Sequence, residues 1–139
     1  MKFTIPGDIR GKGRPRFTRD RFGNVHTYTD PQTKQYEAQV RTLYLKHGGK
    51  RFSGYCGVYI TACYAVPKSY SKKLKEKCLA GEVMPDKKPD TDNILKIVMD
   101  GLNNVAYEDD KQVVKSWISK KYVPGTPGLI VEVAEIGRK

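Results

Sequence analysis

Cysteines, histidines and long apolar runs are scarce in this sequence. Its 139 residues include three cysteines and two histidines, and no apolar run approaches the roughly 18 residues of a transmembrane helix. The first residues also lack the apolar stretch of a signal peptide. We therefore expect a soluble, cytoplasmic protein that does not bind membranes.

The cysteines argue against a disulfide framework and against a zinc finger. Cys56, Cys63 and Cys78 are odd in number, none belongs to a C-x-x-C pair, and neither histidine lies at zinc-finger spacing from them. We expect reduced thiols that pack in or near a core, which agrees with a reducing cytosol.

Acidic residues are few as well, with 15 aspartates and glutamates against 26 lysines and arginines, a net charge of +11. This balance favours a polyanionic partner, nucleic acid first, because phosphates neutralised by basic side chains release counterions. A simpler alternative is that the excess lysine keeps the protein soluble. Six of the fifteen acids nevertheless gather in residues 88–110, KPDTDNILKIVMDGLNNVAYEDD.

Hydrophobic periodicity and turn residues predict a single α/β domain of the α+β type over residues 1–139, with a mixed sheet flanked by helices. The expected order is β-α-β-α-α-β-β. Pro6 indicates that the first strand is an edge strand or carries a bulge, and the second reads as a central strand. The expected strands are residues 2–9, 57–66, 112–122 and 129–136, and the expected helices are residues 31–47, 71–81 and 92–102.

Residues 88–115 form an acidic segment whose pattern predicts metal chemistry. On a helical wheel Asp92, Lys96 and Asp100 share one face. Crowded carboxylates raise one another's pKa, and a divalent cation removes that conflict. If the strand after the helix folds back beside Asp90, Glu108-Asp109-Asp110 complete a site of three or more carboxylates. The apolar side chains that we expect on the opposite, buried face are Ile94, Leu95, Val98, Met99 and Leu102.

The acidic segment also has readings that need no metal. Asp90 and Asp92 can simply cap the helix, next to its positive end. Asp92, Lys96 and Asp100 can form an ordinary solvated ladder at i,i+4 spacing. The later acids can belong to a polar turn.

The stretch KKPDTDNILKIVMDGLNNVAYEDDKQVV resembles the signature of the RusA-type Holliday junction resolvases. That signature has a K/R-P-D-x-D-N-x-x-K run, a D-x-L-N segment, and an aromatic residue followed by x-D-D-x-Q-V. The segments GKGRPRFTRDRFGNVHTYTDPQTKQYE and VPKSYSKKLKE are similar to other parts of the family, so the resemblance covers most of residues 10–115. One departure is Asn104, where relatives often carry glycine.

The resemblance implies a Mg²⁺-dependent, homodimeric endonuclease, frequent in phages and prophages, that resolves four-way DNA junctions in recombination and repair. No organic cofactor is implied. Two opposed nicks in strands related by two-fold symmetry also suit a dimer with two identical sites. The products would carry 5′-phosphate and 3′-hydroxyl ends.

Carried onto this sequence, the resemblance implies that Asp90, Asp92 and Asp110 are catalytic and hold one or two Mg²⁺ ions per subunit. Lys96 matches the essential lysine and would stabilise charge in the transition state. Asp109 competes with Asp110, because a slip of one residue in this turn would exchange them. We expect a structural role for Asp100, and Asn93 would orient a ligand or cap the helix.

The basic residues 10–30, rich in glycine and arginine, form a long loop with a possible small hairpin that turns at residues 22–24. A loop of this size in a compact domain is usually functional. Phe17 and Phe22 would stack at an opened junction centre, unless they pack back onto the domain as part of a solvated hairpin. The residues expected to contact DNA phosphates are Arg10, Lys12, Arg14, Arg16, Arg19 and Arg21 of the loop, with Lys72 and Lys73 of the second helix.

Two other functions are compatible with parts of the pattern. A non-catalytic protein that binds branched or single-stranded DNA would use the acids only for capping and solubility. A D-x-D phosphatase is disfavoured because its nucleophilic aspartate usually follows a buried apolar strand, whereas Lys87-Lys88-Pro89 precedes Asp90 here.

Overall fold

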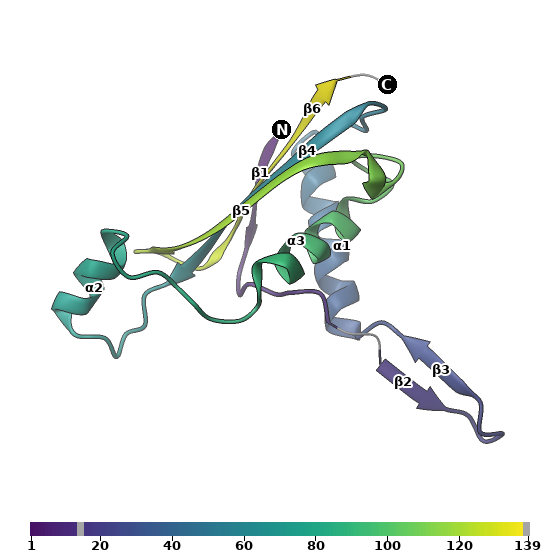
Figure 1. Ribbon diagram of the computed structural model, residues 1–139, viewed down its shortest axis with the longest axis horizontal. Helices are drawn as coiled ribbons and strands as arrows, with labels where there is room; N and C mark the ends of the chain where they lie inside the picture. The colour runs from purple at the N-terminus through teal and green to yellow at the C-terminus, as the bar shows by residue number, and fades with distance from the viewer. Residues whose placement is uncertain (14–15, 138–139) are drawn as a thin grey trace.

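The computed structural model of the chain describes residues 1–13 and 16–137, and it has the expected α+β fold with a mixed sheet (Figure 1). The central sheet has the strand order β1-β6-β4-β5, in which β4 and β5 run parallel and the other pairs run antiparallel. Its strands are β1 (Lys2–Pro6), β4 (Tyr55–Ala65), β5 (Val113–Val123) and β6 (Gly128–Gly137). The helices are α1 (Pro31–Lys46), α2 (Lys72–Leu79) and α3 (Thr91–Leu102), with a 3-10 turn η1 at Asp110–Gln112.

The hairpin expected inside the basic loop is present. It consists of β2 (Arg16–Arg19) and β3 (Val25–Tyr28), which pair antiparallel in a sheet of their own. The side chain of Asp20 shapes its turn, because one carboxylate oxygen accepts the backbone N–H groups of Phe22 and Asn24 at 2.8 and 3.0 Å. A hydrogen bond with His26 lowers the pKa of Asp20.

The positions of β1 and β4 in the sheet agree with the sequence. β1 is an edge strand, as Pro6 indicates, and β4 is central, between β6 and β5. β5 and β6 are consecutive in the chain, yet they are not neighbours in the sheet, because β4 lies between them. The turn that joins them therefore does not close a hairpin.

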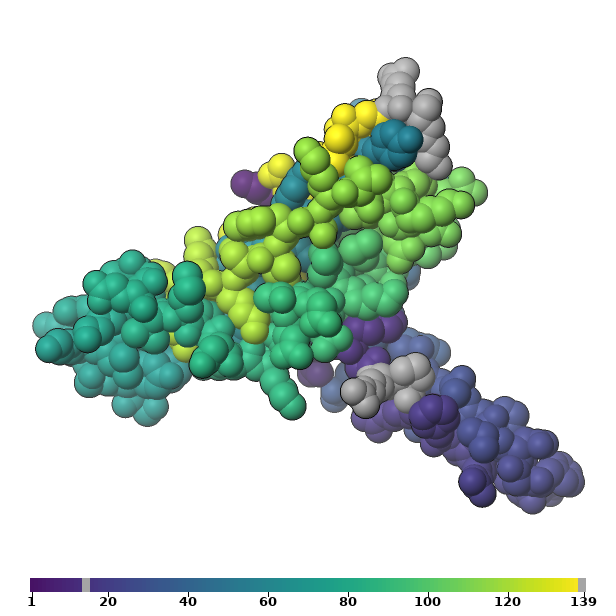
Figure 2. Space-filling view, in the orientation of Figure 1, coloured from purple at the N-terminus to yellow at the C-terminus, as the bar shows by residue number. Residues whose placement is uncertain are grey.

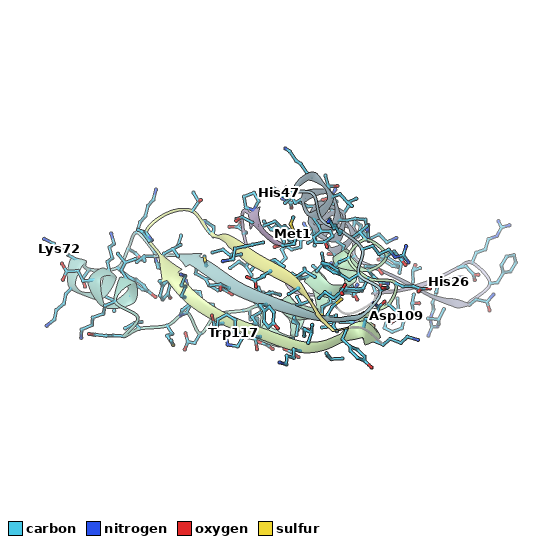
Figure 3. All side chains as sticks on the ribbon, turned by 90° about the horizontal axis from the view of Figure 1, so that it is seen from above. Met1, His26, His47, Lys72, Asp109 and Trp117 are labelled. Carbon is cyan, nitrogen blue, oxygen red and sulfur yellow. The ribbon has the colours of Figure 1, made fainter. Side chains whose placement is uncertain are left out.

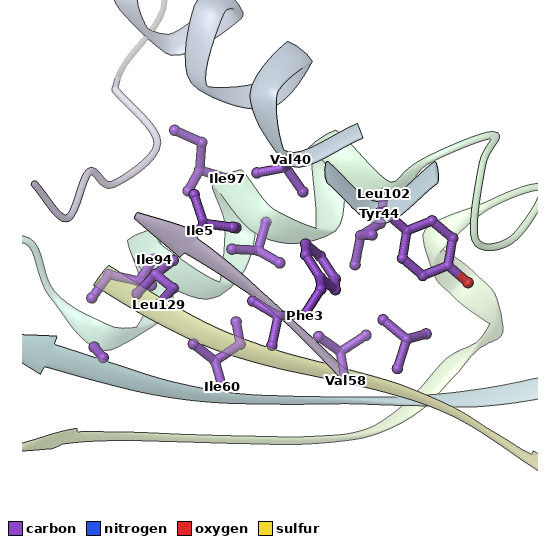
Figure 4. Close-up of a cluster of buried hydrophobic side chains, with 14 of the residues drawn as sticks. Phe3, Ile5, Val40, Tyr44, Val58, Ile60, Ile94, Ile97, Leu102 and Leu129 are labelled. Atoms are coloured by element: carbon purple, nitrogen blue, oxygen red, sulfur yellow. The ribbon is translucent and has the colours of Figure 1, made fainter. Parts of the chain in front are cut away.

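Helices α1 and α3 cover the same face of the sheet, and their apolar side chains meet those of β1, β4 and β6 in one core (Figure 4). The buried face of α3 differs from the helical wheel: Leu95 and Met99 are only partly buried. The wheel omitted both Ile97 and Gly101, and Gly101 is buried because α1 crosses α3 at this point. The buried residues of α3 are Ile94, Ile97, Val98, Gly101 and Leu102.

Two parts of the chain project from opposite ends of this core. The β2–β3 hairpin extends from one end and α2 from the other (Figures 1 and 2). Seen from above, His26 and Lys72 mark these two ends, and Trp117 lies on the side of the sheet away from α1 (Figure 3). The molecule is thus an elongated body with two arms.

Several smaller expectations are also met. Cys56, Cys63 and Cys78 are free and buried, as predicted. Asn104 has a φ of 70°, a conformation that glycine and asparagine adopt more easily than other residues. Its departure from the family pattern therefore concerns turn geometry. No helix of the described residues has the length and apolar character needed to cross a membrane.

The contact between α1 and α3 predicts that Gly101→Ala destabilises the protein. A Cβ at Gly101 would lie 2.8 Å from Cβ of Val40 and 3.0 Å from the backbone oxygen of Glu37, so the helices would have to separate. We expect a loss of about 1–3 kcal/mol in the free energy of unfolding, measured in urea. Gly125→Ala is the matched control, because a Cβ there meets nothing within 4 Å. Equal stability of the two variants would contradict this packing.

Candidate active site

Asp90 and Asp92 lie at the start of α3 with their side chains exposed. Asp90 occupies the N-cap position with an extended backbone (φ −66°, ψ 154°), yet its side chain makes no capping hydrogen bond. The capping interpretation is therefore wrong for Asp90. Neither carboxylate has a hydrogen bond or ion pair within the described part of the chain, so both are available to a ligand.

The start of α3 is packed against the first residues of the basic loop. The backbone N–H of Lys12 donates to the carbonyl oxygen of Asn93 at 2.9 Å. A Cβ on Gly11 would come within 2.6 Å of Pro89, so only glycine allows this approach. The contact borders a hollow of about 380 Å³ lined by Gly11, Lys12, Gly13, Lys88, Pro89, Asp90 and Asn93.

The side chain of Lys12 joins the basic loop to helices α1 and α3 by ion pairs. Its Nζ lies 3.1 Å from Oε1 of Glu37 on α1 and 3.0 Å from Oδ2 of Asp100 on α3. Burial disfavours the charge of Lys12, but the carboxylates of Asp100 and Glu37 outweigh it and raise the pKa of this lysine. Nothing in the sequence pattern pointed to Glu37.

Lys96 lies on the same side of α3, one turn before Asp100. Its Nζ is 3.4 Å from Oδ1 of Asp100, and the side chain is 56% exposed. The structure therefore contains half of the predicted ladder: Lys96 pairs with Asp100, and no ion pair joins Lys96 to Asp92 among the described residues.

Asp109 and Asp110 have different environments at η1. Asp109 is the N-cap of this turn, and its carboxylate accepts the backbone N–H of Lys111 at 3.0 Å. The carboxylate of Asp110 makes no hydrogen bond or ion pair within residues 1–13 and 16–137. Asp109 thus has a structural function, whereas Asp110 is available to a ligand.

Gln112 fixes this turn to the body of the protein and is 3% exposed. Its Oε1 accepts the backbone N–H groups of Glu108 and Asp109 at 2.9 and 3.3 Å. Its Nε2 donates to the carbonyl oxygens of Phe52 and Gly54 at 2.9 and 3.0 Å. In the sequence this glutamine is recognisable only as part of the x-D-D-x-Q-V motif, and no local signal indicates its structural function.

The expected convergence of Asp110 on Asp90 and Asp92 does not occur within one chain. Asp90 precedes α3 and Asp110 follows it, and a helix of 12 residues spans about 18 Å. In Figure 1 the first turn of α3 and the start of β5 lie at opposite ends of the helix. Asp90 and Asp92 supply oxygen donors that Mg²⁺ prefers, but a group of three or more potential ligands is absent from the described residues.

The basic side chains expected to bind DNA lie mainly on the two arms. All residues of β2 and β3 are exposed, Arg16 and Arg19 among them. Lys72 and Lys73 are exposed on α2. Arg10 donates to Oε1 of Gln32 on α1 at 2.8 Å, whereas Arg14 falls outside the described residues.

Phe17 and Phe22 are 71% and 77% exposed. The interpretation in which these rings pack back onto the domain is therefore wrong. The guanidinium of Arg21 lies 5.2 Å from the centre of the Phe22 ring, so the tip of the hairpin combines positive charge with an exposed aromatic surface.

The segment that leads to Asp90 runs between the arms, from α2 to the start of α3 (Figure 1). Lys120 of β5 anchors it by a hydrogen bond of 2.6 Å from Nζ to the carbonyl oxygen of Lys87. Acidic side chains without partners thus lie between two basic projections, which suits a polyanion that reaches across both.

A family model of the endodeoxyribonuclease RusA matches residues 6–134. The chain belongs to the RusA family. Membership of the RusA family implies an endonuclease that resolves Holliday junctions in DNA. The chain is also 37% identical over 125 residues to the "Uncharacterized protein YqaN" of Bacillus subtilis (strain 168), which covers 88% of this chain and 87% of that protein.

The environments of Asp109 and Asp110 predict different effects on stability. Asp109→Ala removes the cap of η1 and should cost about 1 kcal/mol. Asp110→Ala should change the free energy of unfolding by less than about 0.5 kcal/mol, because it removes no hydrogen bond. Urea unfolding of both variants measures the difference. A larger loss for Asp110→Ala would contradict these assignments.

Proposed function

We propose that this chain is a Mg²⁺-dependent endonuclease that resolves four-way DNA junctions by paired symmetric nicks and acts as a homodimer. The observation that carries the proposal is the pair of exposed carboxylates, Asp90 and Asp92, which lack protein partners between two basic arms in a RusA-family chain. Carboxylates without partners inside a DNA-binding surface would repel phosphates, and a cation offsets that repulsion.

In this proposal Asp90, Asp92 and Asp110 hold the metal. When bound, a divalent cation supplies a Lewis acid that lowers the pKa of water and offsets charge on the phosphate. Lys96 presents its ammonium from the same helix and stabilises negative charge that develops on the phosphate. The arms bind the phosphates of the junction on either side of the cut, and Phe17 and Phe22 stack on unpaired bases.

The symmetry of the substrate favours a homodimer, and in a homodimer Asp110 of one subunit can reach the metal-binding residues of the other. A four-way junction needs two opposed cuts, which two identical sites at a fixed separation can make. Asp90 and Asp110 lie at opposite ends of α3, and a two-fold rotation about an axis across this helix exchanges its ends. Asp110 of the partner subunit would then approach Asp90 and Asp92 without any rearrangement of the chain.

Nicking of a synthetic labelled four-way junction tests the proposed activity. We expect symmetric nicks by the wild type in Mg²⁺ and none in EDTA. Asp92→Asn should lose nicking while it binds the junction as tightly or more tightly, because a charge that repels phosphate is removed. Lys96→Met should lose turnover and keep most of its affinity.

The outcomes separate an enzyme from a DNA-binding protein without activity. Binding that ignores Mg²⁺, with no cut under any condition, would support the non-catalytic alternative. Undiminished nicking by Asp92→Asn would contradict the proposed site. Comparison of junctions, forks and flaps shows how narrow the substrate range is.

Mixed dimers test whether Asp110 acts across the dimer. Asp92→Asn and Asp110→Asn subunits, each inactive alone, would be co-expressed with different tags and the mixed species purified. If Asp110 is contributed by the partner, one of the two sites in a mixed dimer carries no substitution, and one strand of the junction is nicked. If each chain builds its own site, both sites are defective and the mixed dimer stays inactive.

A further inference from the structure

We propose that Asp100 is the positioning residue of Lys96, and that Lys12 and Glu37 hold Asp100 in place. This inference rests on the proposed function, because it concerns the lysine assigned to transition-state stabilisation. It gives roles to two acidic residues that the metal site does not use, and it assigns Lys12 to the support of the site instead of to the DNA surface.

Lys96 is exposed on the surface of α3. Its side chain is 56% exposed, whereas the side chain of Asp100 is 22% exposed. An exposed lysine samples many rotamers, and fixing it costs up to about 2 kcal/mol of side-chain entropy. A lysine that stabilises charge in the transition state has to be held in position before the reaction, so another contact must offset this entropic cost. Asp100 is the residue whose contact with Lys96 restricts it.

Two lysines fix the carboxylate of Asp100. Its two carboxylate oxygens have different partners: Oδ1 pairs with Lys96 at 3.4 Å and Oδ2 with Lys12 at 3.0 Å. Rotation of this carboxylate would break one pair or the other. Lys12 in turn is shared with Glu37, whose side chain is 14% exposed, at 3.1 Å.

Lys12 reaches this cluster from a fixed backbone. Its N–H is bonded to the carbonyl oxygen of Asn93, and the neighbouring Gly11 fits closely against Pro89. The Glu37 end is fixed as well, because α1 and α3 touch beside it at Gly101. The cluster is therefore held at both ends by close backbone packing.

Two ammonium groups and two carboxylates make the cluster neutral, and both partners of Lys12 are carboxylates. A phosphate would gain little from this lysine unless both ion pairs broke. Arg19, by contrast, is exposed on the hairpin, where a phosphate can reach it, and Arg16 is 62% exposed although it pairs with Asp30 at 3.3 Å.

Junction cleavage and junction binding, measured on the same variants, test this inference. For Asp100→Asn and Lys12→Met we expect kcat to fall by about 10- to 100-fold, with the Kd for the junction and its salt dependence unchanged. Lys12→Arg keeps the charge and should retain most of the wild-type kcat. Arg19→Met is the contrasting variant, because loss of a phosphate contact weakens binding and lowers the salt slope by about 0.9.

A destabilised control variant and the salt dependence of binding separate a positioning role from a loss of stability or of DNA contact. Val133 is fully buried on β6 and has no part in the ion-pair cluster. Val133→Ala should destabilise the core, and it should leave kcat unchanged when its thermal stability matches that of Lys12→Met. If Lys12→Met lowers the salt slope as Arg19→Met does, Lys12 is a phosphate contact and the inference is wrong. If the wild type nicks the junction and Asp100→Asn nicks it equally fast, the inference fails and the proposed function stands. If the wild type does not nick, the proposed function fails first.

Discussion

The packing of the Gly11–Lys12 backbone on the first turn of α3 is the contact on which the rest of the site depends. It joins the basic hairpin to the helix that carries Asp90 and Asp92 through one backbone hydrogen bond and one glycine that admits Pro89. The contact places the backbone of Gly11 and Lys12, which precede the hairpin, directly beside the residues at the start of α3. The same contact fixes the backbone of Lys12, whose side chain forms an ion pair with Asp100.

Helix α3 acts as a rigid spacer between two sets of acidic residues. Asp90 and Asp92 lie at its start and Asp110 beyond its end, and the apolar face of α3 is buried in the core. Gln112 holds the turn of the second set by hydrogen bonds to the carbonyl oxygens of Phe52 and Gly54. In the proposed homodimer, the second copy of the chain would bring the two sets together.

Local patterns predicted most of the elements, and contacts between distant residues account for the differences. Ser71 caps α2 by accepting the backbone N–H of Leu74, an interaction between neighbours in the chain. The insertion of β4 between β5 and β6 has no local signal, since it depends on pairing across the whole domain. The link from Lys12 to Glu37 spans 25 residues and was equally invisible, whereas Asp90 and Asp92 were found through their spacing.

Metal binding is the central claim, and a titration of Mn²⁺ followed by electron paramagnetic resonance tests it most directly, because carboxylate sites that suit Mg²⁺ also take Mn²⁺. We expect the wild-type protein to bind Mn²⁺. Asp90→Asn, Asp92→Asn and Asp110→Asn should each weaken this binding, and Asp100→Asn should preserve it. Binding that none of the first three substitutions alters would contradict the account.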